Sequence, residues 1–283
     1  MKLGYLAGFS EDELKRASSI GFDALEARIG NTWPGEGLAT ASGRKKVAAA
    51  TRELLDQYGM SISAVAHYAT GGGAKERVAT YRKAIDLCKQ LGVGVLTTLA
   101  GSSPDKSLEE SVKDWAKVFS RVAKIAADNK VQIAFENWPG IHMQFPLKTV
   151  NIAFMPKVWE MMFDAVPSKA LGLEFDPSHL VWQGIDHIAT ARRFVKRIYH
   201  VHAKDTEIRQ DLLKQDGFFT RGWWRYRIPG FGVINWAEFI SVLREGGYDG
   251  GIAIEHEDMV FWGERHTEGL ELGYNHLRPL ICG

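Results

Sequence analysis

The sequence predicts a single α/β domain folded as a (β/α)8 barrel, and three observations support this fold class. Short β-like runs alternate with longer helical runs along the whole chain, the β-like runs number eight, and no linker rich in Pro, Gly or Ser divides the 283 residues. Strands separated by helices form right-handed βαβ units, and eight such units close into a barrel. A doubly wound open sheet is the alternative. We therefore treat residues 1–283 as one barrel domain.

Each predicted element is recognised by its periodicity and its boundary residues. Ser10 and Ser107 stand before acidic first turns, and Pro156 suits the first position of a helix. The longest connection without a clear element, at about residues 206–235, follows the seventh strand and is rich in aromatic residues, which argues against disorder. The predicted strands are 2–6, 24–27, 61–67, 94–99, 131–136, 171–176, 198–203 and 251–257, and the predicted helices are 11–20, 43–58, 75–91, 107–129, 156–165, 185–195 and 236–245.

The composition points to a small-molecule partner. Lys and Arg number 35 against 34 Asp and Glu, so the formal charge of +1 gives no strong field for a nucleic acid or an acidic membrane. No segment has the roughly 18–20 apolar residues that cross a bilayer. The sequence has only two cysteines, Cys88 and Cys282, which makes a disulfide framework improbable, so we expect a cytoplasmic protein. The aromatic connection could be a lid or a subunit contact, which leaves a homo-oligomer open.

The strands at 131–136, 171–176, 198–204 and 251–255 have one large apolar face and one face of small or polar residues. In a barrel the second face points inward, and active sites form at the carboxyl ends of the strands. The inward faces end in two glutamates, an aspartate and a histidine, an oxygen-rich set that suits one divalent metal ion. We expect Mn²⁺ first, with Mg, Co, Fe or Zn as alternatives. These residues are Glu136, Asp176, His202 and Glu255.

Each of these residues also has a simpler interpretation. A single acid at a strand end is often a cap or turn residue, and His202 alone could be a hydrogen-bonded core histidine. Four polar endings on consecutive strands are harder to explain in this way, because unpaired buried carboxylates are costly. Lys204 faces the same way as His202 and could contact a substrate oxygen, or pair with Glu174 or Asp205. Trp138 could stack on a sugar ring or simply pack.

Several motifs resemble the xylose isomerase-like family of TIM barrels, which includes sugar isomerases, epimerases and the endonuclease IV type of repair enzyme. The resemblance covers essentially the whole chain in order. It is carried by "GFDALEA" at 21–27, "FEN" at 135–137, "DPSH" at 176–179, "HVHAKD" at 200–205, "RIPGFGVINW" at 227–236 and "YDGGIAIEHE" at 248–257.

The resemblance implies roles for individual residues. The four residues named above would bind one divalent metal ion, with Glu136 and Glu255 as the acid/base pair of an epimerase. His179 matches a histidine that contacts substrate oxygens beside the metal. Arg227 matches an arginine with the same role in some members, and His67, at the end of the third strand and expected on the inward face, matches a substrate-contacting histidine.

The leading functional hypothesis is a metal-dependent sugar or sugar-phosphate isomerase or epimerase, acting through an enediolate formed next to a carbonyl. A lyase or dehydratase on a keto-sugar or keto-inositol would use the same intermediate. A nuclease of the endonuclease IV type is disfavoured, because "VLTTLAGSS" at 95–103 lacks a histidine and "RIPGFG" stands where that type has an Asp-x-His pair. A non-catalytic sugar-binding barrel is the remaining alternative, and metal analysis would test it.

Overall fold

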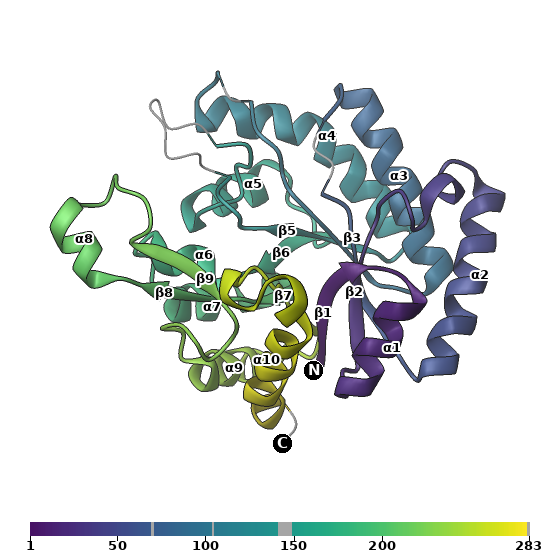
Figure 1. Cartoon of the computed structure of the whole chain (residues 1–283). Helices are drawn as coiled ribbons and strands as arrows, with labels where there is room; N and C mark the ends of the chain where they lie inside the picture. Colours follow the sequence, from purple (N-terminus) through teal and green to yellow (C-terminus); the bar gives the residue numbers. More distant parts are fainter. Residues whose placement is uncertain (69–70, 104, 141–148, 282–283) are drawn as a thin grey trace.

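The computed structural model describes residues 1–68, 71–103, 105–140 and 149–281. Eight parallel strands form a closed barrel in the order β1-β10-β7-β6-β5-β4-β3-β2 (Figure 1). The (β/α)8 prediction is therefore confirmed, and the open sheet is excluded. The barrel strands are β1 Lys2–Gly8, β2 Ala24–Arg28, β3 Ser61–Ala66, β4 Val95–Thr98, β5 Gln132–Glu136, β6 Leu171–Phe175, β7 Ile198–Ala203 and β10 Gly251–Ile254.

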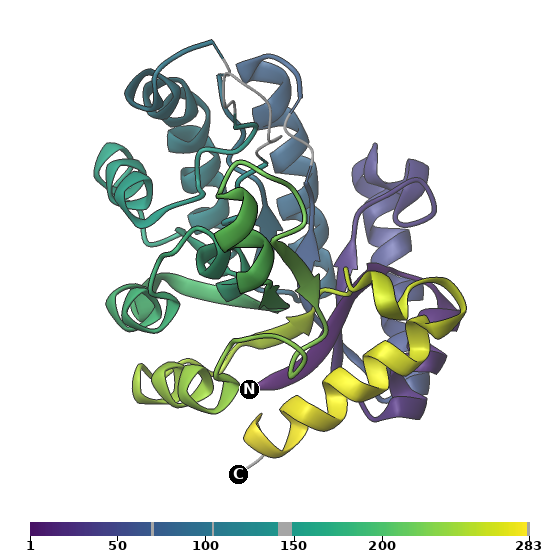
Figure 2. The same ribbon diagram turned by 60° about the vertical axis from the view of Figure 1, so that its left-hand side comes forward.

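The helices surround the barrel, and the last of them lies beside the first strand and the first helix of the chain (Figure 2). The predicted start signals are present: Ser10 caps α1, Ser107 forms a capping box with Glu110 at α4, and Pro156 opens α5. The helices are α1 Glu11–Ile20, α2 Ala41–Tyr58, α3 Ala74–Leu91, α4 Leu108–Asp128, α5 Pro156–Ala165, α6 Pro177–Trp182, α7 His187–Phe194, α8 Gln210–Asp216, α9 Trp236–Glu245 and α10 His266–Ile281, with short 3₁₀ turns η1 Gly35–Leu38, η2 Val195–Arg197, η3 Met259–Phe261 and η4 Gly263–Arg265.

The two faces of the strands divide as the alternation predicts. Ile133 pairs with Leu171 and Phe135 with Leu173, and these side chains are fully buried in the apolar core that continues into the helices. One residue further along, Glu136 pairs with Glu174 on the other face. Burial of each large apolar side chain contributes about 1.5–3 kcal/mol. The apolar layer therefore stabilises the barrel from outside, while its interior carries polar groups.

The inward orientation predicted for His67 is wrong. The pairing of β2 with β3 shifts between Leu25 and Glu26, so that Ser63 is skipped and the later residues of β3 change face. The next pairing sets Val65 beside Leu96, which belongs to the outward layer. His67 follows in the same phase, and its ring packs edge-on against Tyr81 of α3 at 5.8 Å.

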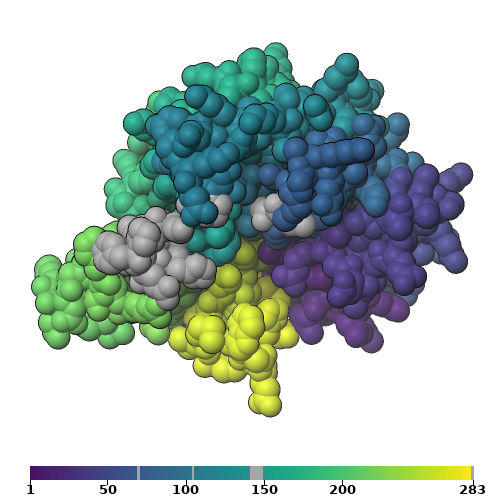
Figure 3. All heavy atoms as spheres, turned by 90° about the horizontal axis from the view of Figure 1, so that it is seen from above, coloured from purple at the N-terminus to yellow at the C-terminus, as the bar shows by residue number. Residues whose placement is uncertain are grey.

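The connection after β7 has more structure than the sequence indicates. Asp205–Ile208 (β8) and Trp224–Arg227 (β9) form a two-stranded antiparallel sheet, with α8 between them. The α8 region projects at the margin of the molecule (Figures 1 and 3). Two helices also lie outside the predicted set: α6, which follows Asp176 directly, and α10, which ends the barrel.

The sequence predicts neither a membrane-spanning segment nor a disulfide framework. Within the described residues, no helix is long and apolar enough to cross a membrane. Cys88 is buried in α3, whereas Cys282 lies outside the described residues. The absence of a disulfide framework therefore stays a prediction.

Candidate metal centre and active site

Glu136, Asp176, His202 and Glu255, which we call the ligand set, meet at the carboxyl ends of β5, β6, β7 and β10. His202 Nδ1 lies 3.2 Å from Glu255 Oε2 and 3.6 Å from Glu136 Oε1. Donor atoms of Glu136, Asp176, Glu255 and the neighbouring His179 all lie within 4.8 Å of one another. The structure thus brings together all four residues that the strand endings indicate, with a second histidine beside them.

Among the described residues, two buried atoms of the ligand set have no hydrogen-bond partner, Nδ1 of His202 and Oδ2 of Asp176. Both residues are completely buried, and burying a polar atom without a hydrogen bond costs about 1–3 kcal/mol. The ammonium group of Lys204, at 3.2 Å, offsets part of this cost for Asp176 Oδ2. His202 Nδ1 faces the carboxylates of Glu136 and Glu255, and Asp176 lies in the same cluster of potential ligand atoms, which is the donor chemistry of a divalent-metal site. The residues present therefore fit one divalent ion held by the ligand set.

Hydrogen bonds fix the orientation of Asp176. Its backbone amide donates to Asn137 Oδ1 at 2.7 Å, and Asn137 Nδ2 donates back to the Asp176 carbonyl at 2.8 Å. The Ser178 amide, at the start of α6, donates to Asp176 Oδ1 at 2.8 Å. Because Oδ1 serves as this helix cap, the other oxygen, Oδ2, is left to face the site.

Lys204 brings an ammonium group into the ligand set and is fully buried. Its Nζ lies 2.5 Å from Glu255 Oε2, 2.9 Å from Glu257 Oε2 and 3.2 Å from Asp176 Oδ2. These carboxylates, rather than Glu174 or Asp205, are its ion-pair partners. Although burial disfavours the charged lysine, the three carboxylates raise the pKa of Lys204 well above its usual value.

His179 stands beside the ligand set on α6. A 2.8 Å hydrogen bond links its Nδ1 to the hydroxyl of Tyr226 on β9. Its Nε2 lies 3.3 Å from Asp176 Oδ2 and 3.5 Å from Glu136 Oε1. The Tyr226 ring also lies 4.4 Å from Lys204 Nζ, so the two-stranded sheet after β7 forms one wall of the site.

The two glutamates of the ligand set have opposite electrostatic surroundings. Burial and the nearby Glu255 carboxylate raise the pKa of Glu136 to about 8. Burial also disfavours the charged form of Glu255, but Lys204 and His202 outweigh it and lower the pKa of Glu255 well below its usual value. Two carboxyl groups with separated pKa values suit one acid and one base. A bound divalent ion would favour the charged form of both.

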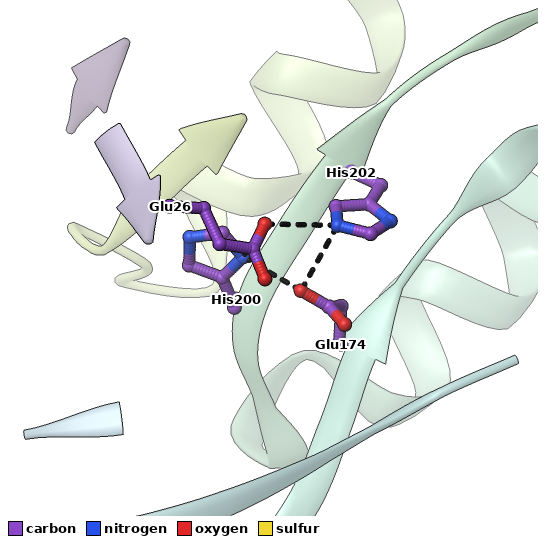
Figure 4. A group of neighbouring side chains, drawn as sticks. All are labelled: Glu26, Glu174, His200 and His202. Atoms are coloured by element: carbon purple, nitrogen blue, oxygen red, sulfur yellow. Dashed lines mark hydrogen bonds and ion pairs between the residues drawn. The ribbon is translucent and has the colours of Figure 1, made fainter. Parts of the chain in front are cut away.

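Below the ligand set lies the inner network, which consists of Glu26, Glu174, His200 and His202 and is drawn in Figure 4. All four side chains are completely buried inside the barrel. His202 belongs to both groups, because its Nδ1 faces the ligand set while its Nε2 lies 2.9 Å from Glu26 Oε2 and 3.1 Å from Glu174 Oε1.

A pocket of about 220 Å³ opens over Glu136, Glu255 and Lys204. Trp138, which is 36% exposed, lines it, so the ring is accessible to a ligand. Sequence reasoning missed three polar residues of the pocket as candidates. Strand alternation could have indicated Glu257, two positions after Glu255, whereas the positions of Arg28 and Tyr68 at the pocket depend on closure of the barrel. The three missed residues are Arg28, Tyr68 and Glu257.

Two of the residues implied by the resemblance lie elsewhere. Arg227 pairs with Asp258 at 2.8 Å and with Glu207, and it joins β9 to the segment after β10. His67 packs against α3, as described above, and the next residue, Tyr68, turns inward, where its hydroxyl donates to Glu174 at 3.1 Å. A substrate role for Arg227 or His67 has no direct support in this arrangement.

The sequence of this chain is similar to those of several known proteins. The profile of the family described as xylose isomerase-like TIM barrel matches residues 14–280. The uncharacterized protein YfiH of Bacillus subtilis is 26% identical over 92% of this chain and 94% of its own length. Inosose dehydratase of Clostridium tetani is 29% identical over 53% of this chain and 48% of its own, so this chain spans about half of that relative.

A solved structure of the IOLI protein with a zinc atom has the same fold, with a TM-score of 0.73 at 20% identity over 99% of this chain and 98% of the other. The family profile and this structural likeness both extend over nearly the whole closed barrel. The chain therefore belongs to the xylose isomerase-like TIM-barrel family.

Proposed function

We propose that this protein is a divalent-metal-dependent isomerase or epimerase of a sugar or sugar phosphate, acting by proton abstraction next to a carbonyl group. The observation that carries the proposal is a pair of buried donor atoms without a hydrogen bond among the described residues, His202 Nδ1 and Asp176 Oδ2, which lie with Glu136 and Glu255 beneath an open pocket. Mn²⁺ is the ion we expect, with Mg, Co, Fe or Zn as alternatives. Trp138 would contact the sugar ring and His179 its oxygens.

The residues divide the chemistry between them. A divalent ion, when bound, would polarise the carbonyl group and stabilise the negative charge of an enediolate. The carboxylate of Glu255 takes the proton from the carbon next to the carbonyl, and Glu136 returns a proton. Return to the same carbon from the opposite face gives the epimer, and return to the former carbonyl carbon exchanges ketose and aldose. Lys204 favours the ionised form of Glu255 in the metal-free site, and a bound divalent ion would favour the same form.

A dehydratase acting on a keto-sugar or keto-inositol is the second candidate. Here the same proton leaves the carbon next to the carbonyl, and the β-hydroxyl departs with a proton as water. Lys204, held by Glu257 at the pocket, places a positive charge where the departing oxygen would gather negative charge. The similarity to inosose dehydratases supports this candidate independently.

Solvent exchange tests the common first step. The metal-loaded protein is incubated with ketoses, their phosphates and keto-inositols in D₂O, and the recovered compounds are studied by NMR and mass spectrometry. We expect deuterium at a single carbon. A product of unchanged composition, apart from the deuterium, indicates isomerisation or epimerisation, and a product lighter by one water indicates dehydration. Absence of exchange from every ketone, with no uptake of any divalent ion, would sink both candidates.

Glutamine variants test the acid/base pair. Glu136→Gln and Glu255→Gln should each slow exchange by at least about 10²-fold, because a neutral amide neither takes nor gives the proton. Glu271→Gln, at an exposed position of α10, is the matched control and should exchange at the wild-type rate. Full activity in either site variant would contradict the assignment.

A further inference from the structure

We propose that Glu26 and Glu174 are positioning residues, which hold His202 with its Nε2–H inside the barrel and its Nδ1 lone pair toward the ligand set. The proposal rests on the metal-dependent function proposed above, because it concerns how the metal-binding histidine is oriented. Neither carboxylate belongs to the ligand set. Both lie against Nε2 of the His202 ring (Figure 4), whereas Nδ1 of the same ring lies 3.2 Å from Glu255 Oε2.

The contacts of Nε2 determine the orientation of the ring. Nε2 of His202 lies 2.9 Å from Glu26 Oε2 and 3.1 Å from Glu174 Oε1. A carboxylate oxygen is a hydrogen-bond acceptor, so one N–H at Nε2 serves both Glu26 and Glu174. A metal ion binds the neutral form of imidazole, and in that form a proton on Nε2 leaves the lone pair on Nδ1. The free nitrogen is Nδ1, which lacks a hydrogen bond and lies 3.2 Å from Glu255 Oε2.

The two carboxylates are themselves fixed by groups from other strands. The Thr97 hydroxyl on β4 donates to Glu26 Oε1 at 2.6 Å, which leaves Oε2 for His202. The Tyr68 hydroxyl donates to Glu174 Oε2 at 3.1 Å, which leaves Oε1 for the two histidines.

The base of the inner network is closed in the same way. His200 Nδ1 lies 3.0 Å from Glu174 Oε1, and the far nitrogen of His200 lies 3.1 Å from the Ser63 hydroxyl. Partners of this kind, behind a metal-binding histidine, set its tautomer and raise its basicity as a ligand.

The inner network is better explained as support than as a second metal site. Its donor set resembles one, with two carboxylates and two imidazoles within 4.8 Å. Among the described residues, however, three of the four histidine nitrogens already have hydrogen-bond partners in the chain. His200 Nδ1 lies beside Glu174, His200 Nε2 beside Ser63, and His202 Nε2 beside Glu26. The orphaned nitrogen of His202 points away from the network, into the ligand set. We therefore expect one ion per chain.

The experiment combines metal titration with NMR of the histidine rings. Co²⁺ is titrated into wild type, Glu26→Gln, Glu174→Gln and the double variant, and the visible absorption of Co²⁺ reports affinity and geometry. Each Gln variant should bind Co²⁺ about 10- to 100-fold more weakly, because a glutamine is a poorer acceptor and can turn its NH₂ group toward Nε2. In ¹⁵N-histidine spectra of the metal-free protein, Nε2 of His202 should carry a proton in wild type.

Asp205→Asn separates positioning from general stability. Asp205 is fully buried and accepts hydrogen bonds from the Gly230 and Ile234 amides and from Trp236 Nε1, which belong to neither the ligand set nor the inner network. This variant should unfold more easily and yet bind Co²⁺ as wild type does. Glu26→Asp, which keeps the charge, should recover part of the affinity lost in Glu26→Gln.

Three results would overturn the proposal. The first is an Nε2 without a proton in the metal-free protein, a result that stands whether or not any metal binds. The second is Co²⁺ affinity within twofold of wild type in the double variant. The third is uptake of two ions per chain, with loss of one in Glu26→Gln. Failure of wild type to bind any ion, with Nε2 protonated as expected, would instead count against the proposed function and leave the ring orientation standing.

Discussion

Lys204 sets the charge balance of the ligand set at the level of a single residue. Its ammonium group contacts Glu255, Glu257 and Asp176, two of which would also bind the metal ion. A divalent ion bound at the same carboxylates would repel the ammonium group of Lys204. The lysine side chain would then turn toward Glu257 and the pocket. Lys204 therefore partly replaces, in the metal-free protein, the positive charge that a divalent ion would supply, and we propose that it contacts the substrate once the ion is bound.

Lys204→Met should separate these two effects. Without the ammonium group, Asp176 and Glu255 lose their cation, and breaking a buried pair in this way costs about 3–5 kcal/mol. We therefore expect the metal-free variant to unfold at a clearly lower temperature, and added Mn²⁺ to recover more stability than it gives wild type. Calorimetry with and without Mn²⁺ checks this.

The kinetics of the same variant give the second half of the prediction. Metal affinity should be equal or higher, whereas kcat/KM for the substrate found by solvent exchange should fall at least about 10²-fold. Lys157→Met, on α5, is the control, because its position is exposed. A loss of metal affinity with unchanged kcat/KM would contradict a role for Lys204 toward the substrate.

At the level of elements, β10 must pass very close to the inner network. A Cβ atom at Gly251 would lie 2.5 Å from the Ser63 Cβ and 2.8 Å from His200 Nε2. Such distances are well inside van der Waals contact, so the first residue of β10 has room only for a hydrogen atom. The glycine thus allows the His200 ring to fit between β10 and β3.

Gly251→Ala should destabilise the protein through this overlap. Inserting a methyl group into a packed interior costs about 1–3 kcal/mol, and we expect the thermal midpoint to fall by several degrees. Gly94→Ala, where no atom lies within 4 Å of the added Cβ, is the matched control and should change the midpoint little. Equal midpoints for the two variants in thermal unfolding would contradict the tight packing of Gly251 against Ser63 and His200.

The β2–β3 pair shows how one element can defeat prediction from sequence. Alternation along residues 61–67 sets Ser63, Val65 and His67 on one face, and the sequence contains no sign of an interruption. The register shift at Ser63 sends Val65 and His67 outward and brings Tyr68 inward. A bulge is decided by the fit of one strand to its neighbour, which a single strand's pattern does not contain.

For the whole molecule, metal binding should be linked to folding. The ligand set comes from four strands spread over residues 136–255, and these positions meet only when the barrel closes. An ion that binds only the folded chain should raise the free energy of unfolding by about 2.7 kcal/mol at a free concentration 100 times Kd. We expect the thermal midpoint to rise with Mn²⁺ concentration and to return on chelation.

Asp176→Asn is the control for this effect. The amide keeps the shape of the side chain and one oxygen but loses the charge, so the midpoint should respond much less to Mn²⁺. The same rise in wild type and variant would mean that the ion binds elsewhere.

The sequence by itself determined the fold class, the order of the barrel strands along the chain and the convergence of Glu136, Asp176, His202 and Glu255. These follow from local patterns, because side chains alternate along a strand and parallel strands end at the same edge of a barrel. The same alternation marked Glu174 and His200 as inward residues, without indicating what they contact.

Only the tertiary structure decided which distant groups meet. The pairing of Glu26 with His202, the ion pairs of Lys204 with Glu255 and Glu257, the outward turn of His67 and the two-stranded sheet behind Tyr226 each depend on contacts between elements far apart in the chain. Periodicity describes the faces of one element at a time, whereas register, bulges and barrel closure arise between elements. The ligand set could therefore be read from strand endings, but the network that orients its histidine could not.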